Sequence, residues 1–131
     1  MDEGGVHKTI LVTRGKRQPR DAADLAERFP GRVVASVRTK GDPYAQGSQK
    51  YYKQLKKQVM SGRFGAMAEL LAFHAQKGDK AAEVRIGLDD RRVQTALEYA
   101  VTKGWPFVVH IEFASLHGAE RGDYMRSLKA M

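Results

Sequence analysis

The chain has 131 residues, of which 42% are hydrophobic, enough for one domain with a buried core and too many for a globally disordered protein. Lysine and arginine outnumber aspartate and glutamate by 23 to 15, and the formal net charge of +8 admits nucleic acid, an anionic membrane or an acidic substrate as partner. The lack of cysteine excludes disulfides and thiolate metal sites.

The N-terminal sequence MDEGGVHKT has neither a basic start nor an apolar core, so it does not resemble a signal peptide. No apolar run is long enough to span a bilayer. We therefore expect a soluble protein without membrane contact, and a cytoplasmic location if no sequence precedes Met1.

Four short apolar runs rich in β-branched residues predict strands. They are residues 9–13 (TILVT), 32–37 (RVVASV), 66–73 (AMAELLAF) and 107–111 (FVVHI). A segment with helical periodicity follows each run. The first two helices are expected from Pro19 to Phe29 and along the stripe Tyr51, Tyr52, Leu55 and Val59, which Gly62 closes.

The third helix has the clearest boundaries, because Asp89 or Asp90 can cap its start and Gly104 its end. The fourth begins near Glu120 and carries Tyr124, Met125, Leu128 and Met131 at helical spacing. The alternating order predicts an α/β fold with four parallel strands alternating with helices, in a single domain over residues 1–131.

Connections that follow the predicted strands are longer and more polar than those that precede them. In parallel α/β proteins, ligand-binding groups lie at the C-terminal ends of the strands. Ionisable residues stand at or near those ends: Arg14, Arg38, Glu69, His74, His110 and Glu112. A neutral histidine and a carboxylate are zinc ligands by type, and the two arginines suit a substrate carboxylate.

Simpler interpretations remain open for each candidate. His110 can be a core histidine that bonds a backbone carbonyl, Glu69 can lie on a half-exposed edge, and arginines beyond a strand are commonly solvated. His7, His74 and His117 form no HxH or HExxH pair, so no local motif defines a metal site.

The basic stretch QKYYKQLKKQ suggests nucleic-acid binding through lysines and stacked tyrosines. At helical spacing, however, Tyr51 joins Leu55 and Val59 on one face and the lysines line the other. We therefore favour an amphipathic helix with a solvated face and consider nucleic acid an unlikely partner. No Walker or Rossmann phosphate-binding pattern is present.

The segments GRFGAMAELLAFHA and ALEYAVTKGWPFVVHIEF resemble the amidohydrolase-related metal-dependent hydrolases. These are TIM barrels whose fourth strand has a pattern such as GEL and whose fifth has a pattern such as PVMVHIE. MDEGGVHKTILV is similar to the end of that family's first barrel helix and its second strand, and FPGRVVASVR is similar to the third strand. The resemblance implies a partial (β/α)8 barrel that covers about strands two to five.

The resemblance also implies functional roles. The strand-five metal ligand falls on His110, and the strand-four acidic position falls on Glu69, which is expected to be both a metal-binding residue and a catalytic group. Arg14, Arg38, His74 and Glu112 are then candidates for substrate contacts. The implied cofactor is a divalent metal, with zinc as first choice, which activates water for hydrolysis or assists decarboxylation of a small-molecule substrate.

The family's HxH on strand one, its histidine on strand six and its aspartate on strand eight have no counterpart here. A complete barrel needs about 250 residues, so we expect a fragment that is inactive in isolation and whose open barrel edges favour homo-oligomers. The alternatives are a small basic α/β module that binds an anionic partner such as RNA, and a regulatory half-barrel that completes itself by oligomerising.

Overall fold

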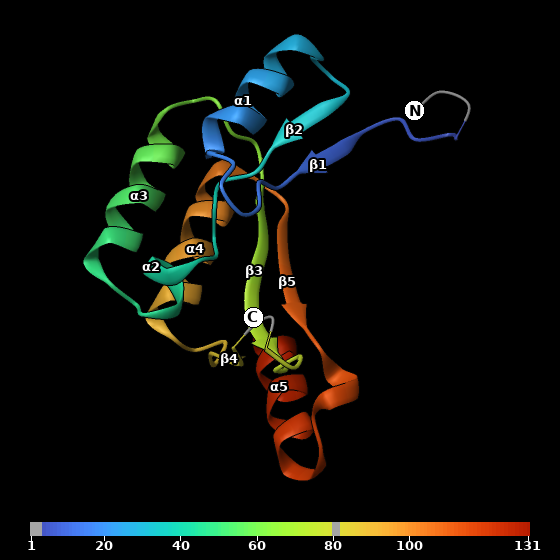
Figure 1. Ribbon diagram of the computed structural model, residues 1–131, viewed down its shortest axis with the longest axis vertical. Helices are drawn as coiled ribbons and strands as arrows, with labels where there is room; N and C mark the ends of the chain where they lie inside the picture. The colour runs from blue at the N-terminus through green and yellow to red at the C-terminus, as the bar shows by residue number, and fades with distance from the viewer. Residues whose placement is uncertain (1–3, 80–81) are drawn as a thin grey trace.

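The computed structural model describes residues 4–79 and 82–131, which form a mixed α/β structure (Figure 1). The strands are β1 (Thr9–Leu11), β2 (Val33–Ala35), β3 (Met67–His74), β4 (Val84–Arg85) and β5 (Phe107–Ile111). The α-helices are α1 (Pro19–Arg28), α2 (Asp42–Ala45), α3 (Gln49–Met60), α4 (Arg91–Lys103) and α5 (Gly118–Ala130), and a short 3-10 helix covers Phe113–Ser115. The interpretation of Met1–Glu3 as a helix end lies outside the described residues.

The α/β class predicted from the sequence is confirmed, but the strands form two small sheets, and an arrangement of four parallel strands is not supported. One sheet holds β1 and β2 in parallel, and the other has the order β4-β3-β5. β3 and β5 are parallel, but β4 is antiparallel to β3 because the chain turns back after His74 and pairs Val84 with it. The described residues close no barrel.

Ser36 explains why the two sheets stay separate. A single parallel bridge between Ser36 and Ala66 connects them. Beyond it, the Ser36 hydroxyl accepts a hydrogen bond from the Ala68 N–H at 2.7 Å and donates one to the Ala68 carbonyl at 2.5 Å. A side chain thus occupies the backbone groups of Ala68 that a continued strand pair would use.

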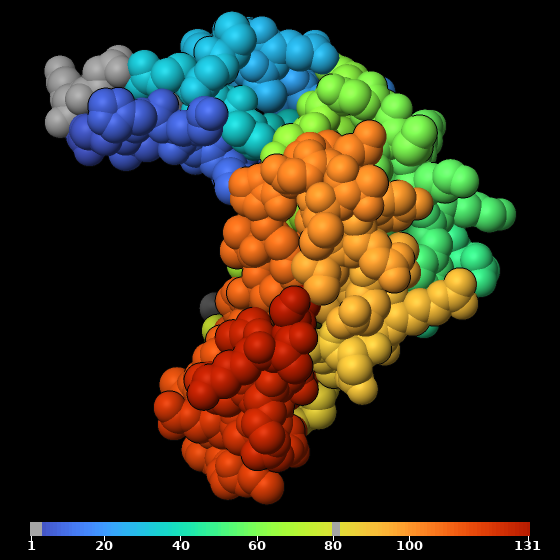
Figure 2. Space-filling view, turned by 180° about the vertical axis from the view of Figure 1, so that it is seen from behind, coloured from blue at the N-terminus to red at the C-terminus, as the bar shows by residue number. Residues whose placement is uncertain are grey.

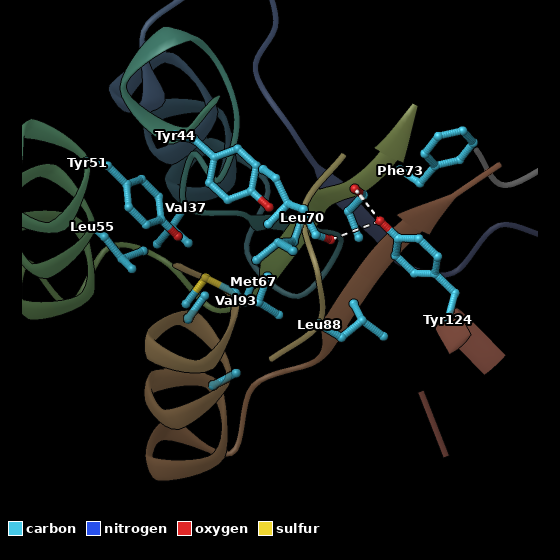
Figure 3. Packing of buried hydrophobic residues seen from close by; sticks show 14 of the residues in the cluster. Val37, Tyr44, Tyr51, Leu55, Met67, Leu70, Phe73, Leu88, Val93 and Tyr124 are labelled. Atoms are coloured by element: carbon cyan, nitrogen blue, oxygen red, sulfur yellow. Dashed lines mark hydrogen bonds between the residues drawn. The ribbon is translucent and has the colours of Figure 1, made fainter. Parts of the chain in front are cut away.

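The main core lies where α3, α4 and β3 meet (Figure 3). Tyr51, Leu55 and Val59 are buried while the lysines of α3 are exposed, so this helix is amphipathic as predicted. Tyr124 anchors α5 through hydrogen bonds from its hydroxyl to the carbonyls of Ala72 and Ile86. The other apolar residues predicted on this helix are exposed: Met125, Leu128 and Met131.

Helix α4 shows how local sequence sets the boundaries. The Asp90 carboxylate accepts a hydrogen bond from the Arg92 N–H at 2.8 Å, which identifies Asp90 and not Asp89 as the N-cap. At the other end, Gly104 has φ of 64°, the left-handed conformation that ends helices. Among the described residues, no helix combines the length and apolar content needed to cross a membrane.

Candidate metal centre

Glu69 and His74 of β3 and His110 of β5 are half-buried and share one face of the β3–β5 pair, where they contact one another or Glu112. The opposite face contributes buried side chains to the main core. Val108 lies two residues before His110 on β5, and so on the same face of the strand, and it is 43% exposed. Figure 2 shows the molecule bent around a hollow between its N-terminal segment, in blue, and α5, in red. The side chains of His74, His110 and Glu112 are 21%, 31% and 16% exposed, so this face is accessible to a ligand.

A bulge in β3 decides which side chains share this face. Simple alternation would place His74 opposite Glu69, five residues earlier. Between Leu71 and Phe73, however, β3 has one residue more than β5, which reverses the alternation. The half-buried residues of the strand are accordingly Glu69, Leu71 and His74, and the others are buried.

His74, His110 and Glu112 form a compact cluster at the ends of the two parallel strands. Nδ1 of His74 lies 2.6 Å from Oε1 of Glu112, and Nε2 of His110 lies 3.3 Å from the same oxygen. The two imidazole rings meet edge to face with centroids 5.8 Å apart. Nδ1 of His110 contacts a second carboxylate, that of Glu69. The ring nitrogens of His110 therefore contact carboxylates and not the backbone carbonyl that the simpler interpretation of a core histidine supposed.

Glu69 is held on the other side of the His110 ring. Its Oε1 lies 3.0 Å from Nδ1 of His110, while its Oε2 accepts hydrogen bonds from Lys40 at 2.5 Å and from Arg14 at 3.0 Å. Burial opposes ionisation of this carboxyl, but the hydrogen bonds and charges of Lys40 and Arg14 outweigh burial and lower the pKa of Glu69 to about 2. Glu69 is therefore a carboxylate at neutral pH.

Glu112 has a similarly cationic environment. Its Oε1 accepts a hydrogen bond from Lys77 at 2.8 Å, and its Oε2 accepts one from the Ala75 N–H at 3.0 Å. The hydrogen bond from Lys77 does most to hold the pKa of Glu112 far below its usual range. Burial raises this pKa, whereas the hydrogen bonds with Ala75, His74 and His110 lower it further. A permanent negative charge thus lies between two imidazoles.

This donor set fits a divalent cation. His74, His110 and Glu112 each offer one ligand atom, and these atoms lie within 4.8 Å of one another. Two imidazole nitrogens and one carboxylate are a usual ligand set for zinc or non-haem Fe(II). Lys77, whose side chain is 61% exposed, provides a positive charge beside Glu112.

The structure brings most of the predicted residues together. His110, Glu69, His74, Glu112 and Arg14 form one connected set. Arg38 does not join it, because its guanidinium donates hydrogen bonds to the carbonyls of Gly15 and Arg17. Whether Glu69 binds metal directly stays a prediction.

Two cationic residues of the cluster, Lys40 and Lys77, were missed from sequence. Lys40 had a detectable signal, because the alternation that groups Val34, Ser36 and Arg38 reaches Lys40 two residues later. Lys77 follows β3 in a polar loop and carries no such signal. A lysine in a long loop is indistinguishable from a solvated one until the fold places it.

No protein-family model, curated protein or solved structure matches the chain. The amidohydrolase resemblance therefore depends on the short sequence patterns alone.

Proposed function

We propose that this chain supplies metal-binding residues of an amidohydrolase-type, metal-dependent hydrolase. The observation that carries the proposal is the meeting of His74, His110 and Glu112 at the C-terminal ends of two adjacent parallel strands. Catalytic groups of (β/α)8 barrels lie at that position. The proposal includes a partial barrel arrangement, for which β1 with β2 and β3 with β5 are parallel neighbours joined by helical crossovers.

In this proposal Nε2 of His110, Glu112 and one nitrogen of His74 hold the ion. A bound divalent metal would lower the pKa of a water molecule and polarise the bond to be cleaved. Glu69, at Nδ1 of His110, would fix the ring orientation and make Nε2 the binding nitrogen, which is the common role of a carboxylate behind a metal-bound histidine. Lys40 keeps Glu69 ionised for that role.

Arg14 is the candidate for contact with a substrate anion. Its guanidinium bonds Glu69 at 3.0 Å, yet its side chain is 75% exposed. A guanidinium has five donors, so most remain available for an incoming carboxylate. The substrate class we propose is a small acid, with hydrolysis or decarboxylation as the reaction.

Metal binding, and not turnover, is the property that this chain's own residues support. The three clustered groups reach the number of protein ligands that a catalytic zinc site has. The remaining ligands of the amidohydrolase pattern have no counterpart in the sequence. We therefore expect the chain to bind metal without measurable hydrolysis by itself.

Calorimetric titration with Zn²⁺ tests this proposal, and Co²⁺ absorption gives a second readout of ligand geometry. We expect one ion per chain, and at least about tenfold weaker binding after His74→Ala or His110→Ala. His117→Ala is the matched control, because this histidine is exposed and precedes α5 outside the cluster. Equal affinity for all four proteins would disprove the metal site.

A further inference from the structure

A second feature, apart from the metal cluster, is a groove of about 810 Å³ between α1 and α3. Residues at the start of α1, in the segment 38–44 after β2 and along α3 line it. Its volume lies within the range of about 300–1,000 Å³ that is common for small-molecule sites. None of His74, His110 and Glu112 lines it.

The lining of this groove is strongly cationic. Among the described residues that line it, Asp42 is the one carboxylate, and six are cationic: Arg20, Arg38, Lys40, Lys50, Lys57 and Arg63. Glu69 neutralises Lys40, and Asp24 and Glu27 neutralise Arg63. Within residues 4–79 and 82–131, the other four have no ion-pair partner. The groove thus holds an excess of positive charge that the protein does not compensate.

Backbone carbonyls, and not a carboxylate, hold the guanidinium of Arg38 in place, so its charge is available to a ligand. The carbonyls of Gly15 and Arg17 accept its guanidinium hydrogen bonds at 3.4 Å each, and Oε1 of Gln58 accepts its backbone N–H at 2.9 Å. The guanidinium also lies against Gly41, where an added Cβ would be 3.5 Å from Nη2 and where φ is 101°. A side chain ordered before binding loses less entropy when it binds.

We propose that this groove binds a phosphorylated small molecule. One phosphate group carries about −1.5 to −2 charges near pH 7, so it matches several unpaired cations in a small volume better than one carboxylate does. Arginine binds phosphate through its planar fork and lysine through its point charge, and the groove offers both. The groove contains none of the three proposed metal ligands, although Lys40, which lines it, also bonds Glu69.

Single-stranded RNA fits the groove less well, because its recognition depends on exposed aromatic rings on which bases stack. Tyr44 and Tyr51 line the groove but are only 1% and 3% exposed, and their hydroxyls already donate to the carbonyls of Leu71 and Arg92. These two rings offer almost no exposed face for stacking, and the third aromatic ring of the lining, Phe64, is half-buried against both hydrophobic clusters. A compact anion uses the cations without needing the rings.

Calorimetry with inorganic pyrophosphate at low salt tests the proposal. We expect one site per chain, binding that weakens as salt rises, and an affinity at least about fivefold higher than for citrate, a carboxylate probe of comparable charge. The variants Arg38→Gln and Lys57→Ala should each weaken binding by about three- to tenfold.

Lys56→Ala is the matched control, because Lys56 adjoins Lys57 on the same helix, is equally exposed and does not line the groove. Lys56→Ala should leave the affinity for pyrophosphate unchanged. His110→Ala should also leave it unchanged while it weakens Zn²⁺ binding, so the proposal of a metal site and the proposal of a phosphate groove can be disproved separately. Circular dichroism verifies folding of each variant.

Three results would overturn the proposal. They are equal weakening by Lys56→Ala and Lys57→Ala, citrate binding as tight as pyrophosphate, and tighter binding of a single-stranded RNA oligonucleotide than of pyrophosphate. The first would leave the charge as a general property of the surface, and the last would assign the groove to nucleic acid.

Discussion

Nδ1 of His74 lies 2.6 Å from Oε1 of Glu112, although 38 residues separate the two along the chain. The bulge in β3 makes this contact, because without it His74 would point into the core side of the sheet. The same carboxylate oxygen contacts His110 and Lys77. Glu112 is therefore the centre of the cluster, and its variants give the sharpest tests.

Removing the charge of Glu112 should weaken metal binding. The change Glu112→Gln keeps the shape of the side chain but replaces an anionic ligand by a neutral amide. We expect the Zn²⁺ affinity to fall by at least about tenfold in calorimetric titration. Glu98→Gln, an exposed change on α4, is the control and should leave affinity unaltered. Unchanged affinity in Glu112→Gln would exclude this carboxylate as a ligand.

Removing Lys77 should strengthen metal binding. Its ammonium lies 2.8 Å from Oε1 of Glu112 and must leave before a cation can take that place. We expect Lys77→Ala to raise the Zn²⁺ affinity about two- to fivefold, because a competing charge with a largely exposed side chain contributes at most about 1 kcal/mol. Lys103→Ala, on the exposed end of α4, controls for net charge. A weaker affinity in Lys77→Ala would instead show that Lys77 positions Glu112.

Lys40 should control the ionisation of Glu69. The pKa of Glu69 is about 2 against an ordinary 4.5, because Lys40 and Arg14 outweigh the opposing effect of burial. A depressed carboxylate pKa stabilises the fold above the unfolded-state pKa, and that stabilisation is lost as pH falls from about 4.5 to about 2. In Lys40→Met the pKa should rise, and stability should depend less on pH over this window.

Carbon NMR titration of the Glu69 carboxyl measures the first effect, and denaturant unfolding at several pH values measures the second. Lys53→Met, an exposed change on α3, is the control. If the Glu69 titration is the same in Lys40→Met as in the unchanged protein, the Lys40 contact does not set this pKa.

Asp90 should stabilise helix α4 as its N-cap. Asp90→Ala removes the hydrogen bond to the Arg92 N–H and the paired contacts with the Arg92 guanidinium. The expected loss is about 1–2 kcal/mol in the free energy of unfolding, measured with urea. The neighbouring Asp89→Ala should cost less than about 0.5 kcal/mol, because Asp89 is exposed and caps no helix. Equal losses would contradict the assignment of the cap.

Leu55 should be essential to the core, although it lies within a lysine-rich stretch. It is fully buried against the main core, so Leu55→Ala should cost about 2–5 kcal/mol of unfolding free energy. Met60 on the same helix is 66% exposed, and Met60→Ala should have a small effect. Similar small losses for both would contradict the packing of α3 against β3 and α4.

Local patterns along the chain predicted most of the elements. The apolar run from Phe107 coincides with β5, and the sequence narrowed the N-cap of α4 to Asp89 or Asp90 and identified its terminal glycine, Gly104. The amphipathic stripe of Tyr51, Leu55 and Val59 was equally clear. These features depend on residues near one another in sequence, where side-chain period and end caps act directly.

The arrangement of the strands was less predictable. A hydroxyl at Ser36 and a two-residue strand at Val84 separate the chain into two sheets, and neither has a distinct sequence pattern. Strand pairing is chosen by contacts between distant segments, so an apolar run alone does not say which neighbour it pairs with or in which direction.

By itself, the sequence determined which residue types stand at the ends of the strands: a histidine on β5 with a carboxylate directly after this strand, and a carboxylate and a histidine on β3. Only the tertiary structure decided that His74 joins His110 and Glu112, and that Arg38 faces a separate basic groove. The physical reason is the bulge and the strand pairing, because one extra residue in β3 moves every later side chain to the other face of the sheet.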